Sequence, residues 1–316
     1  MKHNESRPEF IHSPQWHPGT PTVISVGAFD GIHSGHRMII EKLTEEAKQH
    51  QASSLLFTFH PHPKQILFPE KPLKLLTVLP EKKHVLQSYP LDYVLFYPFT
   101  RSFSELTGKE FLMMLKEKYK VRKLLLGYNH RFGSDRLNDD ETIRRIASDL
   151  GFEAERLPKV EIDGIAVSSS EIKRRIAGKD IETARKLLSY PYLMTGAVVQ
   201  GNRFGRKIGF PTANLRVLSS NKLIPPEGVY LVRVTTEHNV RFGVMNIGRR
   251  PTVDGTNLVM EVHLIDFSGN LYGQTLRIGF LAFLRNEKHF QNVGQLKFQI
   301  EKDIRQAESI IKSRFT

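Results

Sequence analysis

Residues 22–36 read TVISVGAFDGIHSGH, and this segment has the clearest structural pattern in the chain. Its apolar, β-branched beginning predicts a buried strand, and the glycines after it predict a turn. The next residues repeat apolar side chains at the spacing of an amphipathic helix. Strand, loop and helix make a βα unit whose helix N-terminus favours a phosphate.

Two imidazoles lie at the start of that predicted helix. His33 and His36 can give hydrogen bonds to charge that develops on phosphorus oxygens. Gly27, Gly31 and Gly35 allow the backbone to approach a phosphate closely. The segment therefore predicts a phosphate site rather than a plain surface loop.

Length and composition narrow the class of protein. A chain of 316 residues is long enough for two domains with real cores. The absence of cysteine excludes disulfides, zinc–thiolate sites and a cysteine nucleophile, and it fits a cytoplasmic protein. No apolar run is long enough for a membrane span, and the N-terminus lacks the apolar core of a signal peptide.

The chain is basic, with a net charge of +13 and a pI near 9.8. Basic residues outnumber acidic ones on both sides of residue 187, and neither side holds a long block of like charge. We therefore expect general attraction of anionic ligands rather than a nucleic-acid-binding tail. The sequence does not indicate an oligomeric state.

The first half alternates strand-like and helix-like segments. This alternation predicts an α/β fold, with a parallel sheet covered by helices on both faces and ligands at the carboxyl ends of its strands. The expected strands are Thr22–Ala28, Ser54–Phe59, Tyr93–Tyr97 and Val121–Leu126. The expected helices are Gly35–His50, Glu81–Ser88, Ser104–Tyr119 and Asp139–Leu150.

The pattern changes towards the second half. Two short helices, Ser169–Ala177 and Ile181–Leu188, are followed by an expected linker at Ser189–Gly196. Short β-type runs between glycine, proline and asparagine then predict a small antiparallel barrel or sandwich. These runs are Thr195–Val199, Val229–Thr235, Arg241–Ile247, Leu258–Asp266 and Leu276–Phe283. Apolar residues at helical spacing from Phe290 to Ile311 predict a long helix packed on the barrel.

Three further segments of the first half could complete the phosphate site. His60-Pro-His-Pro63 follows the second expected strand and is either a stiff turn or a ligand site. Gly127–Gly133 follows a later strand and carries an amide, a cation and aromatics. Ser168–Arg175 is either a simple helix cap or, with Ser169 and Lys173, a phosphate-binding turn.

The second half has its own cluster of polar motifs. The glycine-rich segment Gly201–Asn214 could cradle phosphates, and Arg206 adds positive charge. Thr212 and Asn214 face one side of an extended segment and offer the hard oxygens that suit Mg²⁺. Glu261 lies in a strand-like apolar run, where it is either a general base or a solvent-facing edge residue.

With these motifs the chain resembles the bacterial bifunctional riboflavin kinase/FAD synthetase (FMN adenylyltransferase) family over nearly its full length. The N-terminal matches are Gly27–His36, Thr58–Pro63, Gly127–Gly133 and Ser168–Lys173. The C-terminal matches are Gly205–Asn214, Pro226–Tyr230, Asn246–Thr252, Glu261 and Asp266-Phe267. The Gly209-Phe-Pro-Thr-Ala-Asn214 segment, downstream of the His33-Ser-Gly-His36 loop in the same chain, makes the resemblance specific.

The resemblance implies an enzyme of FAD biosynthesis with two domains. A Rossmann-like nucleotidyltransferase domain at 1–187 would adenylylate FMN, and a flavokinase β-barrel with a long C-terminal helix at 188–316 would phosphorylate riboflavin. Both reactions would use ATP, and the kinase would also use Mg²⁺. Riboflavin and FMN would be substrates and FAD the product, with no membrane partner. Glu261, His33 and His36 would be catalytic, and Thr212 with Asn214 would hold the metal.

Binding residues follow from the same motifs. The resemblance implies flavin contacts at Phe59, Pro61 and His62. It implies contacts to ATP or its phosphates at Gly27, Phe29, Asp30, Gly35, Asn129, Ser169, Lys173, Gly201, Gly205, Arg206 and Gly209.

Three positions depart from the family pattern: Asn129 replaces an acid, His130 an aromatic residue and Lys173 an arginine. All three fall in the adenylyltransferase half. One alternative is therefore a riboflavin kinase with a weak adenylyltransferase half. Another is a flavin- or RNA-binding regulatory protein that has kept the enzyme fold.

Overall fold

The computed structural model describes residues 7–201, 204–237, 239–252 and 255–315. Asn202 and Arg203, which belong to the glycine-rich motif of the second half, lie outside the described residues. The chain divides into two compact units. The first comprises the residues up to Leu73 and Lys82–Ser168, and the second comprises Lys74–Glu81 and the residues from Ser169 onward.

A parallel sheet forms the centre of the first unit. In the described part of the chain its six strands follow the order β1-β4-β3-β2-β5-β6, and all neighbouring pairs are parallel. The strands are β1 Glu9–Ile11, β2 Thr22–Val26, β3 Ser53–Phe59, β4 Tyr93–Tyr97, β5 Val121–Leu126 and β6 Glu153–Arg156. A separate two-stranded pair, β7 Glu161–Ile162 and β8 Ile165–Ala166, follows the sheet.

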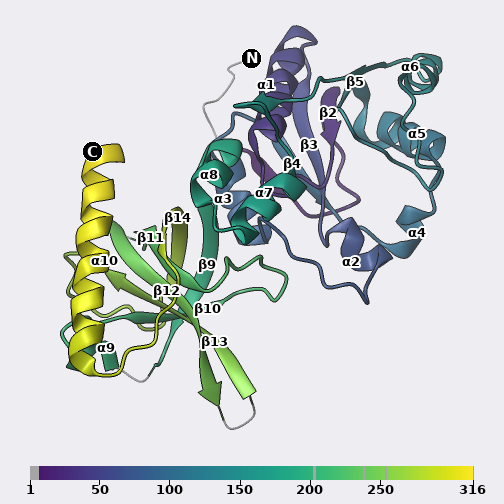
Figure 1. The fold of residues 1–316 in the computed structure, drawn as a ribbon. Helices are drawn as coiled ribbons and strands as arrows, with labels where there is room; N and C mark the ends of the chain where they lie inside the picture. Colours follow the sequence, from purple (N-terminus) through teal and green to yellow (C-terminus); the bar gives the residue numbers. More distant parts are fainter. Residues whose placement is uncertain (1–6, 202–203, 238, 253–254, 316) are drawn as a thin grey trace. The chain divides into compact units, whose positions relative to one another are not determined.

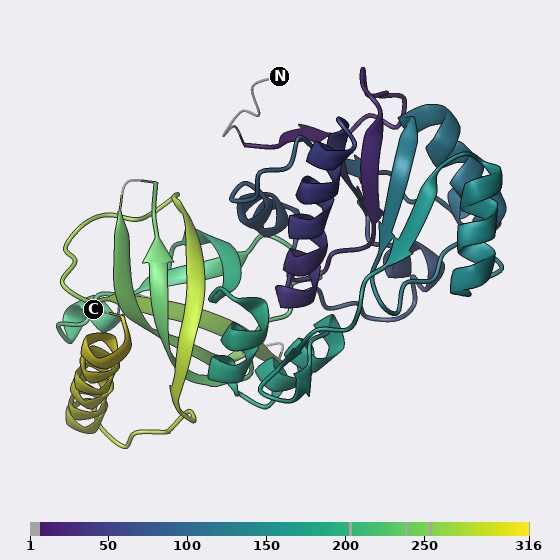
Figure 2. The same ribbon diagram turned by 90° about the horizontal axis from the view of Figure 1, so that it is seen from above.

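Helices cover both faces of this sheet. Helix α1 lies on one face, and α5 and α6 lie on the other (Figure 2). The β2 strand is buried along its whole length, which explains why its sequence is apolar without polar alternation. The helices are α1 Ser34–Gln49, α2 Pro63–Leu67, α3 Leu79–Leu86, α4 Arg101–Ser104, α5 Gly108–Tyr119 and α6 Asp140–Asp149.

The strand order creates a switch point beside β2. From β2 the chain moves outward through β3 and β4, and it then returns to the other side of β2 to form β5 and β6. Ligands of such sheets bind where this reversal opens a crevice at the carboxyl ends of the strands. The loops after β2 and β5 flank that position, as the sequence predicts.

The second unit is built on a closed antiparallel barrel. Its strands follow the order β10-β13-β12-β11-β14-β9, and β9 closes the barrel by pairing with β10. They are β9 Tyr192–Val199, β10 Ala213–Val217, β11 Gly228–Thr235, β12 Val240–Thr252, β13 Gly255–Leu264 and β14 Thr275–Arg285. Helices α7 Ser169–Ala177 and α8 Ile181–Leu188 precede the barrel, and α9 Phe204–Lys207 lies between β9 and β10.

The C-terminal helix α10, Val293–Arg314, lies along the barrel (Figure 1). Ala307 is fully buried, and Ile304 and Ile311 pack with it against barrel residues such as Leu231 and Leu281. This confirms the predicted helix and its packing. The first turn is different, because Val293 is 46% exposed and contributes little to the contact.

A short segment from the first half of the sequence belongs to the second unit. Leu75 pairs with Lys222 in a parallel bridge, and the Lys222 ammonium lies 2.7 Å from a Glu81 carboxylate oxygen. Both side chains of this ion pair are buried, with 1% and 0% exposure. Compactness therefore groups residues 74–81 with the barrel, although the sequence places them inside the first half.

Two predicted elements are wrong. The expected linker Ser189–Gly196 contains the start of β9, because Tyr192, Leu193 and Met194 are buried in a barrel strand. The expected helix Ser104–Tyr119 is interrupted, and Thr107 caps a new helix through a reciprocal capping box with Glu110.

Other elements are missing from the sequence expectation or differ in extent. Strand β12 continues to Thr252, and β13 ends at Leu264 rather than at Asp266. The short elements β1, β6, β10, α2 and α9 were not expected, because three to five residues carry too little periodicity. Across the described ranges, none of the helices is both long and apolar enough to cross a membrane.

Candidate functional site

The loop after β2 is held by its own buried apolar side chains. Phe29 and Ile32 are 2% and 0% exposed, and both adopt left-handed backbone angles, with φ of 45° and 39°. Gly31, at φ 91°, occupies a conformation that side chains rarely adopt. A β-carbon on Gly27 would come within 3.1 Å of the Phe29 ring, so the glycine makes room for that ring.

His33 and His36 form a stacked pair at the start of α1. Their ring centroids are 3.7 Å apart, and His33 Nδ1 accepts the backbone N–H of His36 at 3.4 Å as the helix N-cap. Gly35 lies against the His33 ring, where a β-carbon would be 3.3 Å from Nδ1. Two of the expected site residues are thus in direct contact, and the helix cap orients one of them.

Burial makes both imidazoles neutral near pH 7. It lowers the pKa of His33 to about 4, against the opposing attraction of Asp30. It also lowers the pKa of His36 well below the usual value, assisted by the charges of His33 and Lys82. Within the described part of the chain, His36 Nδ1 is buried without a hydrogen-bond partner. A buried ring nitrogen without a partner is costly unless a ligand supplies one.

The loop after β3 combines an aromatic cluster with a helix cap. Phe59 packs edge-on against Phe99 at 5.3 Å between centroids, and it also contacts Phe57 and Phe103. His62 caps α2, because its Nδ1 accepts the backbone N–H of Lys64 at 3.1 Å. Pro61 follows His60 through a cis peptide bond. This loop adjoins the β2 loop, but His62 has a structural role that accounts for its presence.

An arginine that the sequence did not single out organises the loop after β5. Arg156, on β6, donates from Nη1 to the carbonyl oxygens of Gly127 at 2.8 Å and His130 at 3.1 Å. Its Nη2 donates to the Asn138 carbonyl at 3.0 Å, and its Nε pairs with Asp140. The only signal in the sequence is a short polar segment, which does not predict a strand.

Asn129 and His130 differ in their surroundings. Asn129 is exposed on the β5 loop, so its amide is accessible to a ligand. His130 packs near Phe132 at 5.8 Å, and burial together with the Arg156 charge lowers its pKa to about 4. His130 is therefore neutral near pH 7, and its buried Nε2 has no hydrogen-bond partner among the described residues.

Ser169 and Lys173 lie in the second unit, on the first two turns of α7. Their spacing places them on one side of the helix. Glu171 lies 2.6 Å from Arg174 and 2.7 Å from Arg175, so these two arginines are engaged in ion pairs. Lys173 is the basic residue that lies on the same side of this helix as Ser169.

On the barrel, three polar residues from separate strands lie in one row. Asn214 on β10 is the cross-strand neighbour of Glu261 on β13, which is also paired with Asn246 on β12. Directly paired residues project to the same face of a sheet, so these side chains share a face. The Glu261 side chain is only 17% exposed, which argues against a freely solvated edge residue.

The glycine-rich segment packs against the expected metal ligands. A β-carbon on Gly201 would lie 2.2 Å from the Asn214 side-chain amide, and one on Gly205 would lie 3.2 Å from Thr212 Oγ1. Gly205 also lies against the Phe210 carbonyl, where the corresponding distance is 2.3 Å. Helix α9 interrupts the expected open loop.

Two contacts hold this region to the strands. Arg250 Nη2 donates to Glu261 Oε1 at 3.0 Å. His263 Nδ1 lies 2.9 Å from the Pro211 carbonyl, which joins β13 to the Gly209–Asn214 segment. Arg206 is exposed on α9, and Gly209 has a φ of 90°.

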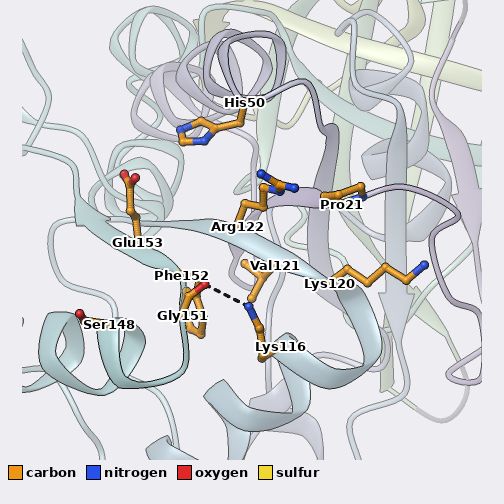
Figure 3. Close-up of a pocket in the computed structure, with 10 residues that line it drawn as sticks. All are labelled: Pro21, His50, Lys116, Lys120, Val121, Arg122, Ser148, Gly151, Phe152 and Glu153. Carbon is orange, nitrogen blue, oxygen red and sulfur yellow. Dashed lines mark hydrogen bonds between the residues drawn. The ribbon is translucent and has the colours of Figure 1, made fainter.

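A surface cavity of about 640 Å³ lies elsewhere on the first unit (Figure 3). It is lined at the amino ends of β5 and β6, at the opposite edge of the sheet from the β2 loop. None of the expected site residues lines it. Its basic lining consists of His50, Lys116, Lys120 and Arg122, and Lys116 is bonded to the Gly151 carbonyl.

Comparisons with known proteins match both halves of the chain. Residues 17–171 match the family model described as FAD synthetase, and residues 188–311 match the one described as riboflavin kinase. The chain is 34% identical over 295 residues to the bifunctional riboflavin kinase/FMN adenylyltransferase of Escherichia coli, covering 93% of this chain and 94% of that protein. The enzyme of the same name from Haemophilus influenzae is also 34% identical, over 92% and 94% of the two chains.

A solved structure shares the whole fold. It is titled a macrolide-efflux protein from Streptococcus pneumoniae, and it superposes with a TM-score of 0.87 at 28% identity over 95% of this chain and 98% of that one. The relatives match at near full length across both units. The chain therefore belongs to the bifunctional riboflavin kinase/FMN adenylyltransferase family.

Proposed function

We propose that the two units of this family member divide its two reactions between the residue sets described above. The chain is a transferase that phosphorylates riboflavin to FMN and adenylylates FMN to FAD. ATP serves both steps, which release ADP and pyrophosphate respectively. The observation that supports this assignment is that one polar centre lies at the β2 loop and another lies on the barrel. We assign residues 1–187 to adenylyl transfer and 188–316 to the kinase.

In the kinase reaction Glu261 is the general base. Its carboxylate accepts the proton of the ribityl 5′-hydroxyl as that oxygen attacks the γ-phosphorus of ATP, and ADP leaves. The hydrogen bond from Arg250 orients the carboxylate. The Gly201–Gly209 segment, with Gly205 and Arg206, supports the phosphates of the nucleotide.

Mg²⁺ fits the kinase centre through Thr212 and Asn214. Both side chains lie close against glycines, Asn214 against Gly201 and Thr212 against Gly205, so the glycine-rich backbone that would support phosphates lies next to their oxygens. Two neutral oxygen ligands suit an ion that keeps several waters and takes its other ligands from phosphates. When bound, the ion would neutralise charge on the phosphate oxygens.

In the adenylyl reaction a phosphate oxygen of FMN attacks the α-phosphorus of ATP and pyrophosphate leaves. His33 and His36 donate hydrogen bonds to the oxygens on which charge develops. The backbone of the β2 loop, from Gly27 through Phe29 and Asp30 to Gly35, cradles the phosphates. Asn129 binds the nucleotide, Ser169 and Lys173 hold phosphate oxygens, and the flavin lies against Phe59, Pro61 and His62.

Separate assays of the two steps test this division. The protein is incubated with ATP and Mg²⁺ and either riboflavin or FMN, and the flavins are separated by chromatography. Glu261→Ala should abolish FMN formation and retain conversion of FMN to FAD, while His36→Ala should do the reverse. Chelation of Mg²⁺ should stop the kinase step.

Other results would contradict the proposal. Loss of both activities in one folded variant would exclude the division into two centres. Accumulation of FMN without FAD in the unaltered protein would support a kinase alone, and the absence of any turnover would exclude the assigned function.

A further inference from the structure

A lysine ammonium is buried directly behind the β2 loop. Lys82, on α3, is 7% exposed and donates from Nζ to the carbonyl oxygen of Ala28 at 2.6 Å. The Thr58 hydroxyl lies 3.5 Å from the same ammonium and donates to the same carbonyl at 3.3 Å. Two side chains from different elements therefore hold one carbonyl in the middle of the phosphate-binding turn.

The groups around Lys82 are one carboxylate and imidazoles that are neutral near pH 7. Asp30, 5% exposed, is the carboxylate that attracts the ammonium. The Lys82 ammonium also helps to lower the pKa of the His36 imidazole on α1 and of the His60 imidazole after β3. His36 is in turn stacked on His33. Burial of a cation is costly unless negative charge compensates it. Asp30 supplies this compensation, and the two imidazoles that interact with the ammonium, those of His36 and His60, carry no charge near pH 7.

The electrostatics agree with this geometry. Burial lowers the pKa of Lys82 to about 8, and Asp30 opposes that shift. The ammonium therefore stays charged near neutral pH beside one carboxylate, and it would attract an incoming polyphosphate. Lys82 is mostly protonated at pH 7 and loses its charge as the pH rises above 8.

We propose that Lys82 is a positioning residue for adenylyl transfer: by holding the Ala28 carbonyl, its ammonium fixes the Gly27–Asp30 turn for the triphosphate of ATP and places positive charge behind His36. The inference rests on the proposed adenylyltransferase role of this unit. It adds a residue that none of the sequence motifs contains. The substrate group recognised is the polyphosphate, whose negative charge the buried ammonium attracts.

The test follows kcat/KM for ATP in the conversion of FMN to FAD between pH 6 and 9.5. This parameter reports the ionisation of groups in the free enzyme. The unaltered protein should lose activity with an apparent pKa near 8. Lys82→Met should lower kcat/KM by about tenfold to a hundredfold at pH 7, which is the effect of losing a hydrogen bond to a charged group. This variant should also lack the alkaline limb, that is, the fall in kcat/KM above pH 8.

Lys83→Met is the matched control, because it removes the same charge from the next residue of α3. The Lys83 ammonium lies over the rings of Phe10 and Phe96 rather than on the β2 loop. This variant should retain the alkaline limb. The riboflavin kinase rate of each preparation, which depends on the other centre, checks that the protein is intact.

The outcomes separate the inference from the proposed function. If the unaltered protein forms no FAD, the adenylyltransferase assignment fails. If FAD forms but the alkaline limb is absent, or if it persists in Lys82→Met, the role of Lys82 is overturned. If Lys82→Met does not fold, the pH profile of the unaltered protein and that of Thr58→Val decide the question. Thr58→Val removes the hydroxyl beside the Lys82 ammonium, so it should shift the apparent pKa of the alkaline limb.

Discussion

At the scale of single residues, His33 couples the stability of the first unit to pH. The folded protein keeps this imidazole neutral because burial lowers its pKa from 6.5 to about 4. Between these values the unfolded chain binds a proton that the folded chain does not, so stability falls as the pH drops. The shift corresponds to roughly 3 kcal/mol of unfolding free energy lost between pH 7 and pH 4.

His33→Asn should remove this contribution and keep the helix cap, since asparagine is a good N-cap residue. Denaturant unfolding can be followed through Trp16, the single tryptophan, which packs against Tyr93 in the first unit. Between pH 7 and pH 4 the free energy of unfolding of the variant should fall by about 3 kcal/mol less than that of the unaltered protein. His17→Asn, at an exposed position, is the control. Equal pH slopes in all three proteins would refute the assignment.

At the scale of elements, the β5 loop depends on Arg156 from the neighbouring strand β6. Arg156→Met removes the donors to the carbonyl oxygens of Gly127, His130 and Asn138. The loop that carries Asn129 should then lose its fixed position, so the KM for ATP in FMN adenylylation should rise by about tenfold while kcat changes less. The kinase rate should not change.

Steady-state kinetics of both reactions measure this effect. Arg144→Met is a suitable control, because this arginine is exposed on α6 and the substitution removes the same charge. If Arg144→Met raised the KM for ATP as much as Arg156→Met, general charge rather than loop geometry would be responsible.

At the scale of the whole molecule, the buried pair of Glu81 and Lys222 ties residues 74–81 to the barrel. Lys222 Nζ also donates to the Leu76 carbonyl and lies 4.2 Å from the centre of the Tyr192 ring. Glu81→Gln leaves a buried ammonium without its counter-charge, which should cost about 3–5 kcal/mol of stability in the second unit.

The double variant Glu81→Gln/Lys222→Met should recover most of that loss, because it removes the unpaired charge. Scanning calorimetry of the full chain compares the three proteins. A single variant as stable as the unaltered protein, or a double variant no better than the single, would show that the pair does not hold the segment in place.

The elements that the sequence predicts best are those with long, uniform burial. Strands β2, β3, β4 and β5 were found because a parallel strand buried on both faces is continuously apolar. The linker expected at Ser189–Gly196 failed for the opposite reason, since proline and polar residues beside Tyr192 mask a barrel strand. The short strands β6 and β10 carry polar residues whose partners are distant in sequence.

The candidate site also has one part that local sequence predicts and another part that depends on strand pairing. The spacing of His33 and His36 places both rings at the first turn of a helix, so a local motif was sufficient to predict their contact. The row formed by Asn214, Asn246 and Glu261 depends on strand pairing, and the sequence could name two of its members but not their register. Lys82 and Arg156 lie in no motif and were missed.

The sequence alone determined the class of each half, the family and the local motifs, because periodicity, glycine positions and capping act over a few residues. Only the tertiary structure decided the strand order that opens the crevice beside β2, the pairing of Glu81 with Lys222, and the burial of Lys82 behind the Ala28 carbonyl. Burial and charge pairing depend on which distant segments come into contact, and local sequence patterns do not specify those contacts.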